Sequence, residues 1–330
     1  RSKPEVDERG TDHARRALHV TAEWAPAYEL VLSISAYVHV KKHVLFELGP
    51  LWVRSIHEQL PADAAAQFAR KSVVHLLKDA DDLLLQLVHV CPEKSDVAGF
   101  LGWFGQLTAG SAYEALAPIV REPGPRLSRD FNGWRDHILD LLGVWNGGYF
   151  RHLDPAILHG LREQASLLRT RIPRTAPGDL IESVTNGLVV EASSELHNVI
   201  LVPQYHHRPY NTDVGIHDGL IILYPCDGAV VAPNDLPPAR LMRLTRALSD
   251  ESRLRMLRFL ARTPSSSLTD VSRFAGLSQP TVHHHLTQLR AAGLVRILCG
   301  PSGPNRYSLR PHALEQLAEQ LGAYLEVAEP

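Results

Sequence analysis

Residues 248–310 constrain the fold more than any other part of the chain. Three helical patterns follow one another there, SDESRLRMLRFLA, TDVSRFAG and SQPTVHHHLTQLRAAG. After Gly293, the β-type runs LVRIL and NRYSL flank the loop Cys299–Pro304. This order and these lengths predict a winged helix-turn-helix, in which the third helix can enter the major groove of DNA.

Local signals mark where the first helices of this module begin and end. We expect a leading helix over Ala239–Leu248, with Ser249 or Asp250 capping the helix that follows. Thr269 is expected to cap the short second helix, and Gly276 to end it. The residues predicted to face the core from these helices are Leu254, Leu257, Phe259, Leu260, Val271 and Phe274.

The third helix separates into a buried face and a polar face. Ser278 is expected to cap it, with Pro280 in the first turn, where a missing N–H costs nothing. Its core residues, at helical spacing, are Val282, Leu286 and Leu289. The residues predicted to face DNA are Ser278, Gln279, Thr281, His283, His284 and Gln288. Glutamine can pair with adenine and threonine can touch a thymine methyl group, so this face suits base contacts.

Two further residues complete the prediction for this module. Arg306, in the expected wing hairpin, is placed to reach a phosphate or the minor groove. His285 precedes a core residue and is expected to be a packed, hydrogen-bonded side chain rather than a base contact. Consecutive helical residues point about 100° apart, so the run His283–His285 does not form a metal site by itself.

The charge distribution agrees with a nucleic-acid partner for one end of the chain. The formal net charge is −2, but residues 239–326 hold 12 Arg and Lys against 6 Asp and Glu. The rest of the chain holds 22 basic and 30 acidic residues. A basic module on an acidic body is expected to present one end to double-stranded DNA.

The segments LSDESRLRMLRFL and LSQPTVHHHLTQLRAAGLV, with the short Arg-Tyr wing, resemble the ArsR/SmtB family of bacterial transcription regulators. The resemblance covers about 80 of the 330 residues. It implies a homodimeric repressor that binds a pseudo-palindromic site and is released by an effector. It also implies dimerisation through flanking helices, here Ala239–Leu248 and Pro311–Glu326. A plausible seam in the second is Leu314, Leu317, Leu321 and Leu325.

The remaining two-thirds of the chain predict an α+β fold. Helical periodicity dominates from about Ala25 to Thr170, and the β-type runs NGLVVEAS, NVILVPQY and LIILYPCD follow, which we expect to form a small antiparallel sheet. The predicted domains are 1–231, opening with a charged arm over 1–16, and 239–330. The Pro-rich segment 232–238 is the expected linker between them.

Metal sensing, common in this family, has little support in the sequence. The short second helix has no Cys, and His312 and Glu315 match only half of the family's other site. The set His39, His43 and Glu47, spaced to share one helix face, fits a polar stripe better than zinc ligands. His206 and His207 follow a strand, where we expect a solvated loop or a contact near DNA. We therefore predict neither a metal nor a cofactor, and leave open whether these two sets bind anything.

The function of the N-terminal part stays open between three hypotheses. It senses a small-molecule effector, it is a ligand-free platform for partner docking, or it is an enzyme with a DNA-targeting tail. Catalytic motifs such as GxSxG, a P-loop or HExxH are absent, and the paired acids Asp81 and Asp82 fit a solvated helix face, so we expect no enzyme. Six aromatic residues are numerous enough to line a pocket, although core packing is the default: Trp103, Phe104, Trp134, Trp145, Tyr149 and Phe150.

The cell compartment is expected to be the cytoplasm. The cysteines Cys91, Cys226 and Cys299 are few and far apart, which argues against a disulfide framework. No run approaches the roughly 20 apolar residues that span a bilayer, and the polar beginning of the chain lacks a signal-peptide core. We therefore expect no membrane partner.

Overall fold

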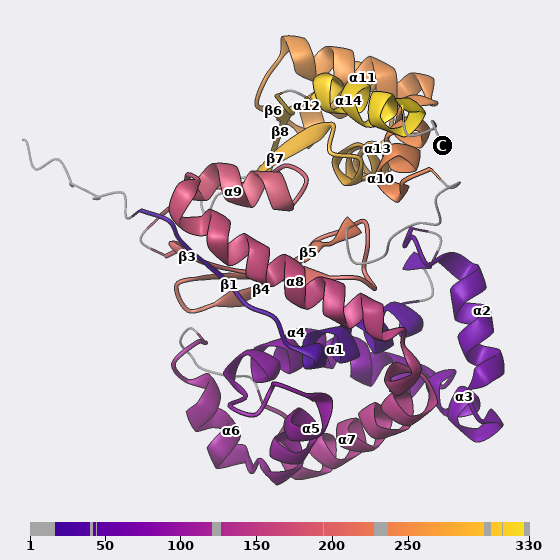
Figure 1. Ribbon diagram of the computed structural model, residues 1–330, viewed down its shortest axis with the longest axis vertical. Helices are drawn as coiled ribbons and strands as arrows, with labels where there is room; N and C mark the ends of the chain where they lie inside the picture. The colour runs from indigo at the N-terminus through magenta and orange to yellow at the C-terminus, as the bar shows by residue number, and fades with distance from the viewer. Residues whose placement is uncertain are drawn as a thin grey trace, which may run out of the picture.

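The computed structural model describes residues 17–39, 42–43, 45–120, 127–193, 195–227, 237–299, 305–311 and 313–326. A helical body lies at one end, a four-stranded sheet crossed by a long helix lies in the middle, and the winged module lies at the other end (Figure 1). The expected arm over 1–16 and most of the expected linker fall outside the described residues.

The helical body and the helices beside the sheet come from the first 184 residues. Their helices are α1 (Pro26–Val38), α2 (Gly49–Gln59), α3 (Ala62–Phe68), α4 (Lys71–Val90), α5 (Val97–Gln106), α6 (Ala109–Leu116), α7 (Phe131–Gly148), α8 (Pro155–Arg171) and α9 (Pro177–Val184). Two 3-10 turns, η2 (Phe150–His152) and η3 (Ile172–Arg174), flank α8.

The strands and the C-terminal helices complete the chain. The strands are β1 (His19–Ala22), β2 (Leu188–Val190), β3 (Asn198–Gln204), β4 (Thr212–Ile216), β5 (Gly219–Pro225), β6 (Ser266–Ser267), β7 (Val295–Cys299) and β8 (Arg306–Leu309). The helices of the winged module are α10 (Ala239–Leu248), α11 (Glu251–Arg262), α12 (Leu268–Ala275), α13 (Gln279–Ala291) and α14 (Ala313–Glu326).

Helix α1 is the centre of the helical body. All of its 13 residues are buried, which explains why its sequence is apolar on nearly every side. Around it, Tyr37 and Trp145 pack with ring centroids 4.9 Å apart, and Trp145 and Tyr149 with centroids 5.0 Å apart. Of the aromatic residues considered as a pocket lining, Phe104, Trp145, Tyr149 and Phe150 are buried in this core, and Trp103 and Trp134 pack against it.

The central sheet is mixed, so the expected antiparallel sheet is wrong in its pairing. Its strand order is β1-β3-β5-β4, with β1–β3 and β3–β5 parallel and only β4–β5 antiparallel. A hairpin turn at His217–Asp218 joins the antiparallel pair, whereas the parallel pairs need long crossovers. Helices α1–α9 supply the crossover between β1 and β3, a non-local pairing that short strand patterns do not reveal.

The two faces of the central sheet belong to different hydrophobic cores. Val202 and Leu223 face the core of the helical body. Leu201 and Ile222 face the other way, into a core shared with α8, α9 and the winged module. The period-2 alternation of β3 and β5 therefore joins both halves of the molecule through one sheet.

The winged module contains a strand that comes from before the expected linker. Strand β2, which we expected in the central sheet, instead pairs parallel with β7 in the order β2-β7-β8-β6. The approach is close at Gly187, where φ is +106° and a Cβ atom would lie 2.8 Å from the Val295 carbonyl oxygen. The wing sheet is therefore anchored directly to the N-terminal part of the chain.

Among the described residues, we find no helix that combines the length and the apolar character needed to cross a membrane.

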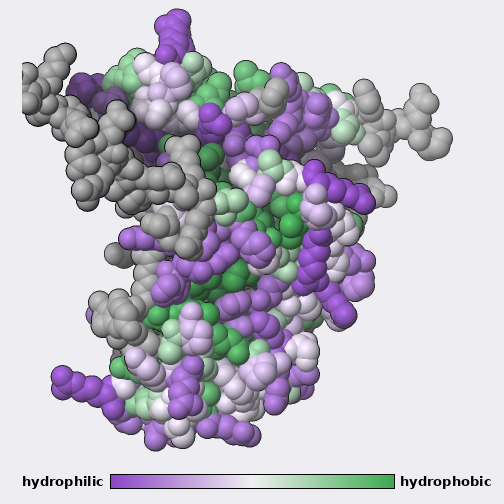
Figure 2. Space-filling model, turned by 90° about the vertical axis from the view of Figure 1, so that its left-hand side faces the viewer, coloured by the Kyte–Doolittle hydropathy of each residue, from purple (hydrophilic) through white to green (hydrophobic). Residues whose placement is uncertain are grey.

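The face turned to the viewer in Figure 2 carries hydrophilic side chains that project from the upper end, where the winged module lies.

Candidate DNA-binding surface

The leading helices of the module begin and end near the predicted positions, but part of their expected core is exposed. Helix α10 has the predicted bounds, and the Asp250 side chain caps α11 by accepting from the Arg253 N–H. Met256, Leu257 and Leu260 are the buried residues of α11. Leu254, predicted to be buried, is exposed because Met256 occupies the inward position.

Helix α12 is capped two residues earlier than expected. Ser267, not Thr269, caps it, and a capping box forms because the Asp270 carboxylate accepts from the Ser267 N–H. Gly276 ends the helix in the left-handed conformation, as predicted. Val271 is buried as predicted, whereas Phe274 is 42% exposed and stacks on Phe259 at 4.4 Å between ring centroids.

Helix α13 has the predicted cap and the predicted buried face. The Ser278 hydroxyl accepts from the Thr281 N–H, and Pro280 lies in the first turn. The core residues are confirmed, because Val282, Leu286 and Leu289 are all at most 1% exposed. Their burial turns the opposite side of the helix outward.

The N-terminal half of α13 carries the exposed residues of the predicted DNA-facing set: Ser278, Gln279, Thr281, His283 and His284. The Ser278 and Thr281 hydroxyls lie 2.8 Å apart, and Gln279 donates to the Thr269 hydroxyl at 3.2 Å. These contacts stay within the surface of the helix-turn-helix, so the polar side chains remain available from outside.

Gln288, the last member of that set, lies in a different environment. It is half-buried near the C-terminal end of α13, where its side-chain oxygen accepts from Arg253 at 2.5 Å. Its amide nitrogen lies 3.0 Å from His284 Nε2. Gln288 is thus less exposed than the N-terminal half of α13 and links His284 of that half to Arg253 of α11.

His285 is half-buried, as expected, but its expected hydrogen bond is not formed at Nδ1. That atom is buried and has no hydrogen-bond partner among the described residues. Burial lowers the pKa of His285, and the neighbouring charge of Arg253 acts in the same direction. A neutral ring on the core side is therefore favoured.

The wing is a β7–β8 hairpin, as predicted, and its loop 300–304 lies outside the described residues. Arg306 starts β8 with an exposed side chain that donates to the Ser265 carbonyl at 3.1 Å. That carbonyl sits in the turn before α12, so Arg306 lies beside the helix-turn-helix at the base of the wing.

Ion pairs connect the winged module to the N-terminal part of the molecule on two sides. Glu182 of α9 lies 3.8 Å from Arg296 of β7 and 3.7 Å from Arg310. On the other side, Arg243 of α10 bonds to Glu47 and to Asp227, the latter at 2.5 Å. Sequence reasoning missed these partners because they are far apart along the chain.

The residues around His206 form a buried polar chain instead of the expected solvated loop. The side chain of Glu29 in α1 is fully buried and accepts from His206 Nδ1 and, at 2.7 Å, from the Tyr205 N–H. On the other side, His206 Nε2 lies 2.9 Å from the Tyr149 hydroxyl, which accepts from Trp52 at 3.1 Å. Sequence analysis missed Glu29, although a charged residue inside an otherwise apolar helix is a signal that could have identified it.

His207 is buried as well, which excludes the expected contact near DNA. Its ring stacks on Phe46 at 5.0 Å between centroids, and its Nδ1 lies 2.9 Å from the Thr212 hydroxyl. Burial, with the positive charge of Lys42 nearby, lowers the pKa of His207 to about 3. The ring is therefore neutral at pH 7.

The helix expected to place His39, His43 and Glu47 on one face does not extend that far. Helix α1 ends at Val38, and the three side chains have separate partners. His39 Nδ1 lies 2.7 Å from the Ser35 carbonyl, His43 Nε2 lies 2.8 Å from the Tyr37 carbonyl, and Glu47 pairs with Arg243. Within the part of the chain that the structure describes, no three His, Cys, Asp or Glu residues are grouped to hold a metal. His312 of the partial family site lies outside that part.

Asp81 is not part of a solvated face, although its neighbour Asp82 is exposed. The Ser35 hydroxyl donates to Asp81 at 2.8 Å, and His39 Nε2 lies 3.9 Å away. Burial raises the pKa of Asp81 to about 7, against the opposing effect of the Ser35 hydrogen bond. The group is therefore a polar contact between α1 and α4.

Comparison with known proteins identifies one segment. A helix-turn-helix domain family matches residues 248–297, which covers α11, α12, α13 and the beginning of β7. No match is found among curated proteins, and none among solved structures. A helix-turn-helix domain with an exposed polar third helix points to a DNA-binding regulator.

Proposed function

We propose that this protein is a sequence-specific repressor that binds a pseudo-palindromic operator as a homodimer. The observation that carries the proposal is the exposed polar half of α13 beside Arg306 of the wing. A helix in the major groove with a basic wing at its side supplies both base contacts and phosphate contacts. The likeness of this module to the ArsR/SmtB family supports the homodimer and the repression.

A reporter gene tests the direction of regulation. Genomic fragments that the purified protein retains would be placed between a constitutive promoter and the reporter, with and without the protein expressed in the same cells. Repression is the expected result, because a dimer on such a site excludes polymerase. Activation, or no change at a site that is bound in vitro, would contradict the proposal.

Arg306→Ala is expected to weaken binding to specific and random DNA by a similar factor. A phosphate contact contributes to affinity through counterion release, so its loss should reduce the slope of log K against log salt by about 1. Fluorescence anisotropy over a salt series measures both quantities.

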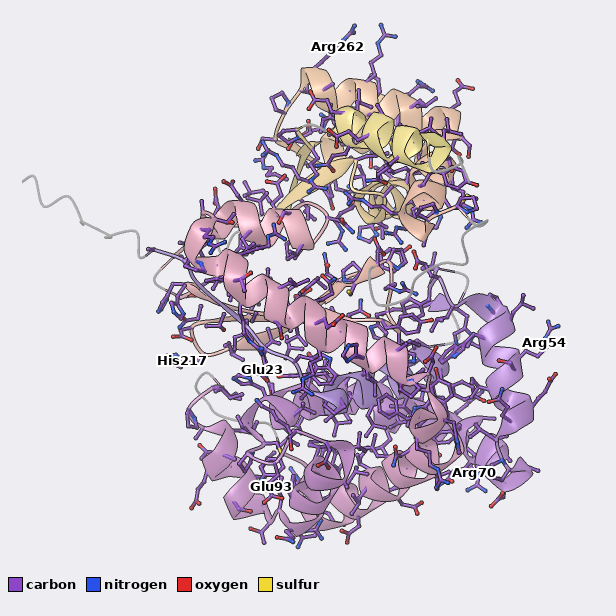
Figure 3. The ribbon with its side chains drawn as sticks, in the orientation of Figure 1. Glu23, Arg54, Arg70, Glu93, His217 and Arg262 are labelled. Carbon is purple, nitrogen blue, oxygen red and sulfur yellow. The ribbon has the colours of Figure 1, made fainter. Side chains whose placement is uncertain are left out.

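The matched control is Arg54→Ala. Arg54 is an exposed arginine on α2, in the helical body and far from the winged module (Figure 3). If wild type and the Arg306 variant have the same affinity for DNA and the same slope of log K against log salt, the wing does not contact the DNA backbone.

Helix α14 supports the homodimer. It packs along α10, with Arg240 donating to Gln316 at 3.1 Å. Three leucines of its expected seam are exposed: Leu314 at 60%, Leu321 at 42% and Leu325 at 67%. Burial of three leucines from each chain contributes favourable free energy in proportion to the apolar area removed from water.

The pair of substitutions Leu321→Asp and Leu325→Asp is expected to convert the dimer to a monomer. A charge on this stripe would have to be desolvated in the interface, which costs several kcal/mol. Light scattering coupled to size exclusion gives the mass directly. Leu51→Asp, at a leucine of α2 that is 73% exposed, is the control. A wild-type monomer, or a double variant that stays dimeric, would exclude this interface.

For the N-terminal part, effector sensing and ligand-free docking remain the two candidates, and an enzymatic role is not proposed. The closed aromatic packing around Trp145 favours docking, whereas a cavity at the base of the winged module favours sensing. The cytoplasmic location stays a prediction.

A further inference from the structure

A cavity of about 350 Å³ lies where the N-terminal part meets α10 and α13. Three arginines line it: Arg243 and Arg246 from α10, and Arg253 from α11. The rest of the lining is largely apolar and includes Leu45, Pro209 and Ala247. Its volume lies within the range of small-molecule sites, which are typically apolar clefts with a few fixed polar groups.

The arginines differ in how far their charge is already neutralised. Arg243 is paired with both Glu47 and Asp227. Arg253 donates mainly to neutral acceptors, namely the Ala247 carbonyl at 2.7 Å and the Arg246 carbonyl at 2.8 Å. Its nearest carboxylate oxygen, on Asp250, is 3.9 Å away.

Arg246 lines the cavity without a carboxylate partner among the described residues. Its side chain is exposed, and it forms no ion pair with any residue in the described ranges. Arg246 therefore leaves the cavity with positive charge that no carboxylate among its lining residues balances, and the Asp250 carboxylate that pairs with Arg253 is 3.9 Å away. A guanidinium group binds a carboxylate or phosphate through paired, charge-assisted hydrogen bonds.

We propose that this cavity binds a small organic anion with an apolar body, the anionic group on Arg246 and Arg253 and the body against Leu45 and Pro209. The apolar wall distinguishes such a ligand from a free inorganic ion, which would leave that wall exposed to water. The cavity adjoins Gln288 and Ala291, at the C-terminal end of α13. At 1.5 Å per residue, this end lies about 18 Å from Gln279, so the DNA-facing half of the helix is a separate surface.

The ligand would touch both halves of the regulator at once, and this consequence rests on the proposed function. On one side of the cavity, Arg253 donates to Gln288 of α13. On the other side, the lining residue Tyr210 belongs to the loop after β3 that also contains the buried His206. An anion that recruits Arg253 competes with its bond to Gln288, and Gln288 in turn contacts His284 of the DNA-facing half of α13. Bound anion should therefore weaken DNA binding, and DNA should weaken anion binding by the same factor.

The test uses 2-naphthoate and octanoate as probes, each with its uncharged amide, in calorimetric titrations of the full chain. We expect both carboxylates to bind, and each amide to bind at least about tenfold more weakly, because it lacks the charge that the arginines recognise. Arg246→Ala should weaken carboxylate binding by a similar factor. Arg54→Ala, an exposed arginine outside the cavity, should leave it unchanged.

Two results would overturn the ligand site. One is that neither carboxylate binds with a Kd below about 1 mM, because a single charged contact supplies enough binding free energy to reach that Kd. The other is that carboxylates bind equally to wild type and to Arg246→Ala, in a variant whose circular dichroism shows it to be folded. If Arg246→Ala instead lowers affinity for all DNA and no carboxylate binds, the cavity is a DNA-phosphate contact, and the proposal fails.

A second arm separates failure of this site from failure of the proposed function. DNA affinity is measured with and without saturating 2-naphthoate on a fragment that the protein retains. A several-fold loss of affinity in wild type, absent in Arg246→Ala, supports the coupling, and unchanged affinity in both contradicts it. A protein that binds no DNA at all would refute the regulator, while the calorimetry would still decide the anion site.

Discussion

Replacing Glu29 with alanine is expected to destabilise the protein by about 3–5 kcal/mol, because it removes one partner of a buried polar pair. The carboxylate is fully buried and serves both His206 Nδ1 and the Tyr205 N–H. Without it, two buried donors lose their acceptor, and each such loss typically costs about 1–3 kcal/mol. Urea denaturation followed by circular dichroism measures the change.

Two variants isolate the reason for that loss. Glu29→Gln keeps the shape and one acceptor oxygen, so we expect it to cost less than alanine. Glu58→Ala removes an exposed glutamate of α2 and should change stability by no more than about 0.5 kcal/mol. If Glu29→Ala costs no more than Glu58→Ala, the chain Glu29–His206–Tyr149 does not hold the helical body to the loop after β3.

Replacing Gln279 and Thr281 together with alanine is expected to abolish most of the discrimination between specific and random DNA. Both side chains are exposed on the first turn of α13, and both can contact base edges. Each good base contact contributes about 1–3 kcal/mol of discrimination, so the specific affinity should fall at least about tenfold. Affinity for random DNA should barely change, because phosphate contacts supply it.

Competition binding with specific and random duplexes of equal length gives the ratio directly. A matched control, Gln59→Ala with Thr170→Ala, removes the same two residue types from exposed positions on α2 and α8. An unchanged ratio in the α13 variant would exclude Gln279 and Thr281 as residues that read base sequence.

The winged module was predictable because its signals are local. Ser278 and Gly276 mark helix ends through capping that needs only a few neighbouring residues, and Val282, Leu286 and Leu289 repeat at helical spacing. Where a local signal was ambiguous, the predicted start of a helix was wrong by only two residues: Ser267, and not Thr269, caps α12.

Pairings between distant segments were not predictable in this way. Strand β2 reads like its neighbours in sequence, yet it joins β7 more than a hundred residues later. The alternation of a short strand shows that one face is buried but does not specify the partner strand. The ion pairs of Arg243 were not predictable for the same reason, because its partners Glu47 and Asp227 come from separate parts of the chain.

The buried histidines show a second limit. Adjacent His206 and His207 after a strand resemble an exposed polar loop, and nothing nearby reveals that Glu29, about 180 residues earlier, supplies an acceptor. A polar group can be buried only where it finds partners, and those partners are fixed by the tertiary fold. The exposure of Ser278, Gln279, Thr281, His283 and His284 needed no such information, because their neighbours on the helix determine which side they occupy, whereas the contact of Gln288 with Arg253 did.

Sequence-specific binding is tested by selecting bound fragments from the source genome with the purified protein at two salt concentrations. We expect enrichment of a short palindrome that persists at the higher salt, because base contacts on two copies of α13 survive when phosphate contacts are screened. Binding that is weak, blind to sequence and lost at the higher salt would contradict a sequence-specific regulator.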